Sequence, residues 1–516
     1  MTGSRTEPFD VAIVGFGPSG AVAAALLGQA GLKVYVCDKS ADVYAKPRAI
    51  ALDHEIMRVF QQLGIAEEVA LHAEPFTPSE YFGVDGQLIK RMTMVAPPYP
   101  LGHTPSMVFS QPPVERALRE RVAQMANVTV ELGMALCHLN QDDDGMTLEM
   151  KHADSDNSSP TRSVRAQYVI GCDGASSTVR AQLGLTLEDL DFDEPWLVVD
   201  LLVNERGLAK LPRTSVQYCE PDRPCTLVIG PGNHRRWEIS LKPGEDLRYV
   251  TTPEGSWALL ARWLTPEDGE LWRQASYRFH ALVAPQWRSG RAFIVGDAAH
   301  QQPPFLGQGM CQGIRDVANL AWKLVAVLRT DVTGAAAESL LDSYSTERQQ
   351  HVRALTGRIK AIGAVICERD LAKARARDAA LLAECGGVVK DTPRQDVMPR
   401  LEGGCLSAKP SSARGTIFPQ PRVHAPHSSM LLDERGGCGW RLLLDEHVAL
   451  TTAVGPSLTT LRLGADLHEC DGVLAAWLRR HECHAALVRP DHCVYGVAAD
   501  AAGLQALLAE HAAQFA

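Results

Sequence analysis

The segment FDVAIVGFGPSG, residues 9–20, decides the fold class of this chain. Residues 9–15 are apolar and run into glycines, as a buried strand that ends in a tight turn does. Residues 21–30 are rich in alanine and predict a helix, and residues 33–38 predict a second strand. A strand, a glycine turn, a helix and a strand within about 30 residues form the βαβ pattern of a parallel sheet. The sequence therefore predicts a doubly wound α/β domain.

The glycines of this segment fit the pattern GxGxxG, and each has its own task. Gly15 permits the tight turn, Gly17 lets a pyrophosphate approach the backbone, and Gly20 lets the helix pack on the strand. The first turn of the helix offers free N–H groups to the phosphates. Asp38, at the end of the second strand, can accept hydrogen bonds from ribose hydroxyls. The segment thus predicts a site for the ADP half of a dinucleotide, a half that NAD and FAD share.

Two later segments favour FAD over NAD. Asp173-Gly174 ends the predicted strand before residue 173, and Gly296-Asp297 ends another at residues 291–297. Ligands of doubly wound sheets bind at the carboxyl ends of strands, where an acid can hold a ribityl hydroxyl. The loop of residues 303–310 is shaped by Pro and Gly and opens a further helix, whose first amides can face the N1–C2=O edge of a flavin.

Composition limits the partners and the location of the protein. The chain has 516 residues, of which 46% are hydrophobic and 22% charged, and a net charge of −10. No basic block stands out, so nucleic acid and anionic membrane are not expected partners. No apolar run is long enough to span a membrane, and residues 1–10 do not resemble a secretory signal. Together with scattered cysteines and no CxxC pair, this predicts a cytoplasmic protein.

Metal-ligand chemistry is present in one short segment, His481, Cys483 and His484. A zinc site would need a second pair of ligands at a suitable spacing, and the sequence shows none. The sequence therefore predicts no metal site.

The order of the motifs predicts a chain built from several domains. Residues 1–190 and 285–385 form a discontinuous first domain, into which residues 75–110 and 191–284 insert an antiparallel sheet. Residues 386–415, rich in Gly, Pro, Ser and Arg, predict a linker, and residues 416–516 predict a separate α/β domain.

Taken together, the three motifs resemble the single-component FAD-dependent aromatic hydroxylases, or group A flavoprotein monooxygenases, over residues 9–370. The resemblance implies an α/β fold with a Rossmann-like FAD-binding domain, an inserted antiparallel β-sheet substrate domain and a C-terminal thioredoxin-like domain, here without CxxC. Shorter stretches are similar to 3-(3-hydroxyphenyl)propionate hydroxylases: residues 46–49, 192–196, 218–224, 235–238 and 303–311. The C-terminal domain and the helical residues 340–385 are candidates for a homodimer contact.

The resemblance also assigns roles to the cofactor residues. It places Gly15, Gly17, Gly20 and Asp38 at the ADP half, although relatives often carry Glu where this chain has Asp38. It places Arg48 and Gln111 along the cofactor, Asp173 near the pyrophosphate and Asp297 at the ribityl chain. The residues that it places beside the isoalloxazine are Pro303, Gly307, Gln308, Gly309 and Met310.

The implied reaction consumes NADH or NADPH and O2, and hydroxylates a phenolic ring through a flavin C4a-hydroperoxide. The implied substrate is a small phenol of the 3-(3-hydroxyphenyl)propionate kind. Candidate catalytic residues are Tyr218 on the inserted sheet, His54 after the Arg48 loop, and Pro303. His300 is expected to be structural. A carboxylated substrate also needs a cationic partner, for which Arg223, Arg235 and Arg236 are close in sequence.

Three alternatives remain open at this point. The chain could be a tailoring hydroxylase of a polycyclic or polyketide phenol, which composition does not separate from a catabolic enzyme. It could be an NAD-dependent dehydrogenase, against which the Asp-Gly and Gly-Asp segments argue. It could also be a flavin-binding protein without catalytic activity.

Overall fold

The computed structural model describes residues 7–155, 160–329, 331–425, 428–450 and 458–515. Its first sheet is built around the N-terminal βαβ unit of β1 (Phe9–Val14), α1 (Pro18–Gln29) and β2 (Val34–Asp38). Strand β1 lies parallel between β2 and β11 (Arg162–Gly171). The strand order is β17-β18-β11-β1-β2-β8, where β8 is Val128–Leu132, β17 is Arg288–Ser289 and β18 is Ala292–Ile294.

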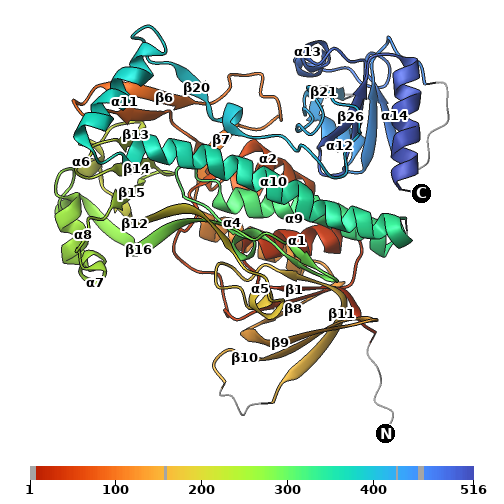
Figure 1. Cartoon of the computed structure of the whole chain (residues 1–516), viewed down its shortest axis with the longest axis horizontal. Helices are drawn as coiled ribbons and strands as arrows, with labels where there is room; N and C mark the ends of the chain where they lie inside the picture. The colour runs from red at the N-terminus through yellow and green to blue at the C-terminus, as the bar shows by residue number, and fades with distance from the viewer. Residues whose placement is uncertain (1–6, 156–159, 330, 426–427, 451–457, 516) are drawn as a thin grey trace.

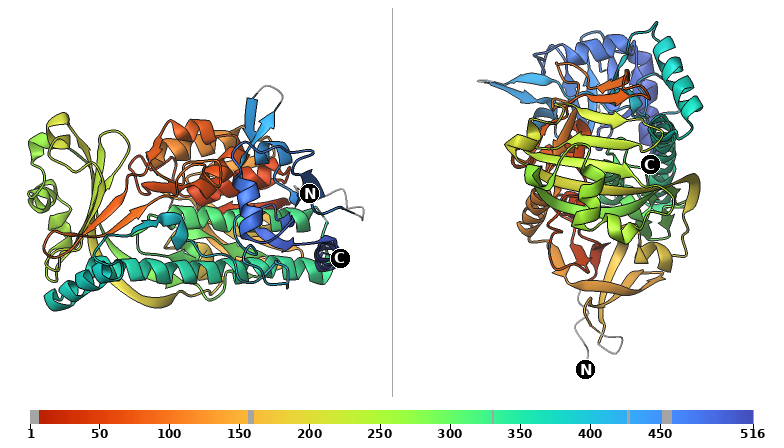
Figure 2. Two further views of the ribbon diagram at one scale, coloured as in Figure 1. Left: turned by 90° about the horizontal axis from the view of Figure 1, so that it is seen from above. Right: turned by 90° about the vertical axis from the view of Figure 1, so that its left-hand side faces the viewer.

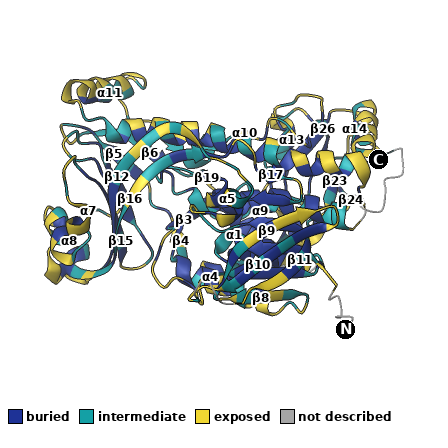
Figure 3. Cartoon of the chain, turned by 60° about the horizontal axis from the view of Figure 1, so that its bottom comes forward, coloured by how far each residue is buried: buried dark blue, intermediate teal, exposed yellow. Residues whose placement is uncertain are grey.

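An antiparallel hairpin, β9 (Met134–Asp142) and β10 (Gly145–His152), extends this sheet through β11. Helices α1, α4 (Gln111–Ala123) and α9 (Gly309–Leu328) share one apolar core with this sheet, and this part of the molecule carries much of the dark blue colour of buried residues in Figure 3. Helices α1 and α9 approach closely because Gly313 has no side chain: a Cβ there would lie 2.4 Å from the Ser19 hydroxyl. This contact brings the start of α9 beside the glycine turn.

The second sheet has the order β19-β16-β12-β15-β14-β13-β5-β6-β20. Its two long strands, β12 (Glu188–Val203) and β16 (Gly269–Val283), connect it to the first domain (Figure 1). Its middle consists of β13 (Ser215–Tyr218), β14 (Cys225–Ile229) and β15 (His234–Ser240). Helices α7 (Leu247–Val250) and α8 (Pro253–Leu260) cover one apolar face, so the opposite face is left for the site.

The outer strands of the second sheet include β5 (Ser79–Phe82), β6 (Leu88–Thr93) and β19 (His300–Gln301). A small third sheet has the order β3-β7-β4, where β3 is Ala51–Asp53, β4 is Ala73–Pro75 and β7 is Ser106–Phe109. The short helices are α2 (His54–Leu63), α3 (Ala66–Ala70), α5 (Thr178–Gln182) and α6 (Glu205–Leu208). Helix α10 (Gly334–Cys367) runs along the molecule, and α11 (Leu371–Ala383) follows it (Figure 2). No described helix is long and apolar enough to cross a membrane.

The segment predicted as a linker is paired to the second sheet. Strand β20 (Asp391–Pro393) lies parallel to β6, and the single-turn helix η3 (Arg394–Val397) follows directly. The Gly, Pro and Ser residues around it therefore form turns against the two domains and not a free connection. This pairing matters for function because it carries Arg394 to the site described below.

The C-terminal domain has a sheet of order β24-β23-β25-β26, with β23 and β24 parallel and the other pairs antiparallel. Its elements are β21 (Arg422–Ala425), β22 (Ser428–Leu431), α12 (Leu432–Gly436), β23 (Trp440–Leu444), β24 (Leu458–Arg462), α13 (Val473–Arg480), β25 (Ala485–Val488), β26 (Val494–Ala498) and α14 (Ala501–Gln514). This strand order is compatible with the predicted thioredoxin-like fold.

Buried ion pairs fix the C-terminal domain to the first domain. Arg58 of α2 donates to both carboxylate oxygens of Asp433, at 2.6 and 2.9 Å. Glu347 of α10 accepts from Arg489 at 2.7 Å and lies 3.0 Å from the Lys323 ammonium. Because breaking a buried pair leaves an uncompensated charge, these contacts define one arrangement of the two domains.

Candidate functional site

The glycine turn is tightly packed at two of its glycines and open at the third. Gly15 has φ +100°, and a Cβ there would lie 2.4 Å from the Cys172 carbonyl oxygen. A Cβ on Gly20 would lie 1.9 Å from the Gly15 carbonyl oxygen. By contrast, a Cβ on Gly17 would meet no atom within 4 Å. Packing therefore demands glycine at the first and third positions, whereas Gly17 faces open space at the start of α1, where a ligand can approach.

A cavity of about 670 Å³ lies between this turn and the inserted sheet. Its size is within the range of small-molecule and cofactor sites. It brings together many of the predicted cofactor residues: Gly17, Arg48, Gln111, Asp297, Gly307, Gly309 and Met310. The first turn of α9 borders it, so the free amides of that helix end lie beside the cavity.

Asp297 faces this cavity from the end of β18. Burial among protein atoms raises the pKa of its carboxyl, and no described group donates a hydrogen bond to it. An unpaired carboxyl in such a place is suited to accept hydroxyl groups from a ligand. The free acid beside the glycine turn and the open space at Gly17 fit the ribityl-phosphate portion of FAD.

The predicted residues Gln111 and Arg48 both lie beside the cavity, and Gln111 holds the loop that carries Arg48. Gln111 accepts from the Ala49 amide at 2.7 Å and donates to Glu115 at 3.2 Å. The Arg48 guanidinium lies 4.7 Å from the centre of the Tyr44 ring. Gln111 is thus a fixed polar group, whereas Arg48 is exposed at the cavity mouth.

Other predicted cofactor residues support the site from behind and do not line the cavity. Asp38 accepts from the amides of Phe16 (2.6 Å) and Ser40 (2.7 Å), and so closes the glycine turn. Asp173 accepts from Ser177, the N-cap residue of α5, at 2.5 Å and from the Val179 amide in the first turn of that helix at 3.0 Å.

In the flavin loop, the sequence assignment is displaced by one residue. Pro303 is buried, and its neighbour Pro304 lines the cavity. Gln308 is also turned away, because its side-chain oxygen accepts from Arg315 at 2.8 Å. The loop is tight because Gly307 has φ +63°, and a Cβ there would lie 2.7 Å from that of Ala51.

The inserted sheet presents a polar face to the cavity. Gln217 of β13 and Thr226 of β14 lie opposite each other, and the Thr226 hydroxyl donates to the Gln217 side-chain oxygen at 2.5 Å. Ser79 and Ser215 on neighbouring strands also line the cavity. Because side chains alternate along a strand, Tyr218 points to the other face.

The structure thus places the predicted catalytic Tyr218 away from the cavity. Its hydroxyl accepts from the Trp263 indole at 3.1 Å, and it packs on the helix-covered face of the sheet. Burial raises the pKa of Tyr218, which disfavours a phenolate there. The residues of the same strand that line the cavity are Ser215 and Gln217.

Glu238 of β15 is a cavity residue that the sequence reading missed. Its side chain is 6% exposed and lines the cavity, and no described group donates a hydrogen bond to it. Burial raises the pKa of Glu238 to about 7, despite the opposing influence of Arg236 and Arg273. A carboxyl that changes charge near neutral pH inside a cavity is a candidate general base. Glu238 lies two residues after Arg236 on the same strand, so the alternation of side chains places both on one face.

Cations near the cavity are mostly neutralised. Asp200, fully buried, accepts from Arg236 at 2.7 Å and lies 3.5 Å from Arg273. Arg223 pairs with Glu245 at 2.6 Å, and Arg235 donates to backbone carbonyls. Arg223 and Arg236 are thus paired with carboxylates, and Arg235 does not line the cavity.

Arg394, from the segment predicted as a linker, is different. Its guanidinium lies 4.4 Å from the centre of the Phe76 ring and donates to the Leu306 carbonyl at 2.7 Å. It lines the cavity, and no carboxylate of the described residues lies within ion-pair distance. The sequence did not indicate Arg394 as a site residue because it lies far along the chain from the other motifs.

His54 and His300 are both outside the flavin cavity. His54 lines a separate cavity of about 270 Å³ between α2 and the C-terminal domain, and burial lowers its pKa. It is therefore placed away from the catalytic position that the sequence predicted. His300 lies 2.8 Å from Asp316 and stacks on Trp287, which are the contacts of a structural residue.

Comparison with known proteins identifies relatives of the chain. A profile described as "FAD binding domain" matches residues 8–358. A probable NADH-specific resorcinol 4-hydroxylase of Rhodococcus jostii is 37% identical, with 98% of this chain and 95% of that protein covered. A 3-(3-hydroxy-phenyl)propionate/3-hydroxycinnamic acid hydroxylase of Burkholderia cenocepacia is 32% identical, with 99% and 97% covered.

Solved structures share the fold over the whole chain. The flavin-dependent monooxygenase PieE, in complex with FAD and substrate, has a TM-score of 0.82 at 22% identity, with 99% of this chain and 100% of that one covered. Aklavinone-11 hydroxylase, in complex with FAD and aklavinone, has a TM-score of 0.78 at 22% identity, with 98% and 99% covered.

Proposed function

Because this chain belongs to the FAD-binding-domain family, and within it to the FAD-dependent aromatic hydroxylases, we propose that it hydroxylates a small phenol bound on the polar face of the inserted sheet. The predicted family is thereby confirmed, and with it the enzyme class and the use of FAD, NADH or NADPH, and O2. The single observation that carries the proposal further is the unpaired Glu238 carboxyl in the cavity.

FAD, when bound, accepts electrons from the nicotinamide and supplies the activated oxygen. The residues that would hold it are Gly17 at the pyrophosphate, Asp297 at the ribityl chain, and the first amides of α9 at the isoalloxazine. The Rossmann-type glycine turn and a free acid at a strand end are both present, so the chain fits the cofactor. The arrangement also leaves the polar sheet face open to a second ligand.

The substrate needs its phenol proton removed, because phenolate is the more electron-rich ring. Glu238 can accept that proton, since its pKa of about 7 keeps a large fraction ionised at neutral pH. Gln217, Thr226 and Ser79 can hold the hydroxyl groups of the ring by hydrogen bonds. Aromatic side chains, Phe76, Phe279 and Phe305, supply apolar walls that exclude water.

We favour a resorcinol-like phenol without a carboxylate. Such a ring presents two hydroxyls to neutral polar groups and to one carboxyl, and the relative named as a resorcinol hydroxylase supports this reading. For the same reason NADH is the proposed electron donor. A hydroxyphenylpropionate is the second candidate, and Arg394 is the observation that favours it, because a guanidinium with no carboxylate partner among the described residues can receive the substrate's carboxylate.

Product identification under 18O2 tests the proposal. The purified FAD protein is incubated with NADH and resorcinol, 3-(3-hydroxyphenyl)propionate, phenol or a multi-ring phenol, and products are weighed by mass spectrometry. We expect one labelled oxygen in a trihydroxybenzene from resorcinol. NADH oxidation that yields only hydrogen peroxide with every small phenol, or turnover of multi-ring phenols alone, would show the substrate assignment to be wrong.

A further inference from the structure

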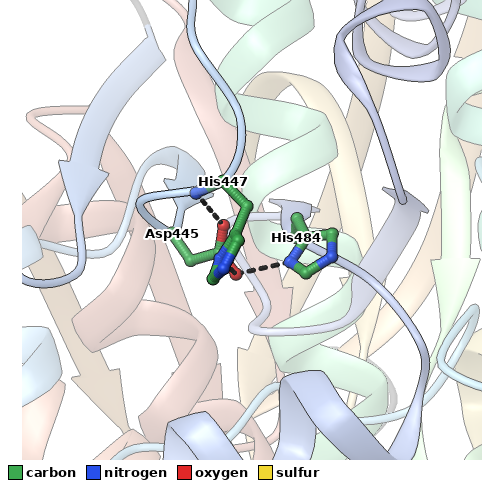
Figure 4. Close-up of side chains that lie close together, drawn as sticks. All are labelled: Asp445, His447 and His484. Carbon is green, nitrogen blue, oxygen red and sulfur yellow. Dashed lines mark hydrogen bonds and ion pairs between the residues drawn. The ribbon is translucent and has the colours of Figure 1, made fainter.

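Three side chains of metal-ligating type lie close together in the C-terminal domain (Figure 4), and none of them lines the flavin cavity. They are Asp445, His447 and His484. One carboxylate oxygen of Asp445 lies 2.6 Å from Nδ1 of His484 and 3.4 Å from Nδ1 of His447. The ligand atoms of the three residues all lie within 4.8 Å of one another. The side chains therefore converge on one point from two separate segments of the chain.

This arrangement supplies the second half that the sequence lacked. Of the three residues that suggested a metal, only His484 takes part. Cys483 is 3% exposed and belongs to the apolar core of the domain, and His481 is bonded to Ser412 at 2.7 Å. The partners of His484 lie some forty residues earlier and become neighbours only because β23 pairs with β25.

The backbone holds two of the ligands in place. Asp445 directly follows β23, His484 directly precedes β25, and Leu444 pairs with Ala485 in the antiparallel register. The Asp445 amide donates to the His484 carbonyl at 2.9 Å, which continues the ladder by one step. Their side chains thus start from a fixed cross-strand distance.

His447 is held by a turn and by its neighbour. Its amide donates to the other Asp445 carboxylate oxygen at 2.9 Å, an Asx-type turn that also orients the carboxylate. Val448, the next residue, is 6% exposed and lies in an apolar cluster with Leu442 and Ala485. The loop is therefore anchored on both sides of the imidazole.

We propose that Asp445, His447 and His484 bind one zinc-type divalent ion, with water as the fourth ligand. Two imidazoles and a carboxylate suit Zn²⁺ and its borderline neighbours, whereas Mg²⁺ and Ca²⁺ prefer sites made of oxygen alone. Bonds of about 2.0–2.1 Å in a tetrahedron put ligand atoms about 3.3 Å apart. The His447 pair is already at 3.4 Å, and only the hydrogen-bonded His484 pair, at 2.6 Å, has to open.

Exposure leaves room for the water ligand and for entry of the ion. The His447 and His484 side chains are 62% and 40% exposed, whereas Asp445 is 12% exposed. None of the three lines the flavin cavity, so the ion would take no part in the flavin reaction and would tie the loop after β23 to the start of β25.

Metal retention by the full-length, FAD-loaded protein tests this proposal. The protein is stripped with EDTA, dialysed against Zn²⁺ and then against metal-free buffer, and its zinc is counted by mass spectrometry. With 17 His and 13 Cys in the chain, other weak sites can contribute, so the readout is a difference between variants. The wild-type protein should retain one more zinc ion per chain than the His447→Ala and His484→Ala variants. His468→Ala, an exposed histidine of the same domain, should match wild type.

A second measurement separates binding from misfolding. Zn²⁺ should raise the melting temperature of wild type and of His468→Ala, and not that of His447→Ala, whereas Mg²⁺ should leave all of them unchanged. Bound FAD and NADH-dependent hydroxylation should be equal in all variants. Equal zinc in wild type and in both ligand variants, or no retained zinc in wild type, overturns the proposal.

Discussion

Thr226 and Glu238 lie directly opposite each other on β14 and β15, and both face the flavin cavity. The Thr226 hydroxyl, however, gives its proton to Gln217 at 2.5 Å. Glu238 therefore receives no hydrogen bond from its polar neighbour. Because no such bond stabilises the ionised carboxylate, burial raises the pKa of the Glu238 carboxyl to about 7. The sheet thus holds a carboxyl ready to take a proton from a ligand.

If Glu238 is the general base, Glu238→Gln should lower kcat/KM about 100-fold or more, since such catalysis contributes about 10²–10⁴-fold. In wild type, kcat/KM should rise with pH through about 7, because the ionised form is the active one. Glu220→Gln is the control, because Glu220 is a partly exposed carboxylate paired with Arg262 and its replacement should leave kcat/KM unchanged. A pH profile of the Gln variant with the same inflection as wild type would assign the titration to another group.

The same carboxyl should make stability depend on pH. Its folded pKa of about 7 exceeds the usual value of 4.5, so the folded state holds the proton more tightly than the unfolded state. Stability should therefore fall as the pH rises from about 4.5 to about 7, by at most about 3 kcal/mol. Glu238→Gln should remove that loss and be the more stable protein at pH 8. Urea unfolding of the substrate-free enzyme at pH 5 and pH 8 measures it, and parallel changes in both proteins would contradict it.

Two glycines of one motif should behave differently. Gly15→Ala meets a backbone oxygen at 2.4 Å and a φ of +100°, so we expect little folded protein. Gly17→Ala meets no atom within 4 Å and should fold with normal stability, yet bind FAD more weakly because the methyl group occupies the approach to the pyrophosphate. Circular dichroism and FAD titration of the apoprotein separate the effects. Normal FAD affinity in Gly17→Ala would place the pyrophosphate elsewhere.

Asp297→Ala should weaken FAD binding about 10- to 100-fold, as loss of a hydrogen bond to a charged group costs about 1.5–3 kcal/mol. Its carboxyl faces the cavity with no described donor, so the side chain is available for the cofactor. Fluorescence titration of the apoprotein gives the dissociation constant. Asp193→Asn, at a half-exposed position of β12, should match wild type. An unchanged dissociation constant in Asp297→Ala would remove Asp297 from the FAD site.

The parts of this site that the sequence predicts are those carried by local chain geometry. Gly15 and Gly20 are dictated by contacts within one turn, and Asp297 by the end of one strand. The sequence did not show which face of its strand Tyr218 lies on. Side chains alternate along a strand with a period of two, so a shift of one residue exchanges the cavity face for the packed face. Glu238 becomes visible only when β14 and β15 are in register.

Pairing between distant segments is what the sequence cannot supply. Strand β20 joins β6 across some three hundred residues and so carries Arg394 to the cavity. The composition of residues 386–415 indicates turns, and such a segment is taken for a linker when its pairing with β6 is not known. The same holds for Asp445 and His484, which meet through β23 and β25.

Arg394 should distinguish the two candidate substrates. Its guanidinium contacts a carbonyl and an aromatic ring but no described carboxylate, so a carboxylated ligand would gain a charge-assisted hydrogen bond there. Arg394→Met should raise the dissociation constant of 3-(3-hydroxyphenyl)propionate about 10- to 100-fold and that of resorcinol less than about threefold. Perturbation of the flavin absorbance reports both constants. Arg400→Met, on an exposed pair with Glu402 in the same segment, is the matched control. Equal weakening of both ligands would show that Arg394 acts by packing against Leu306 and Phe76, and would leave the enzyme without an identified carboxylate partner.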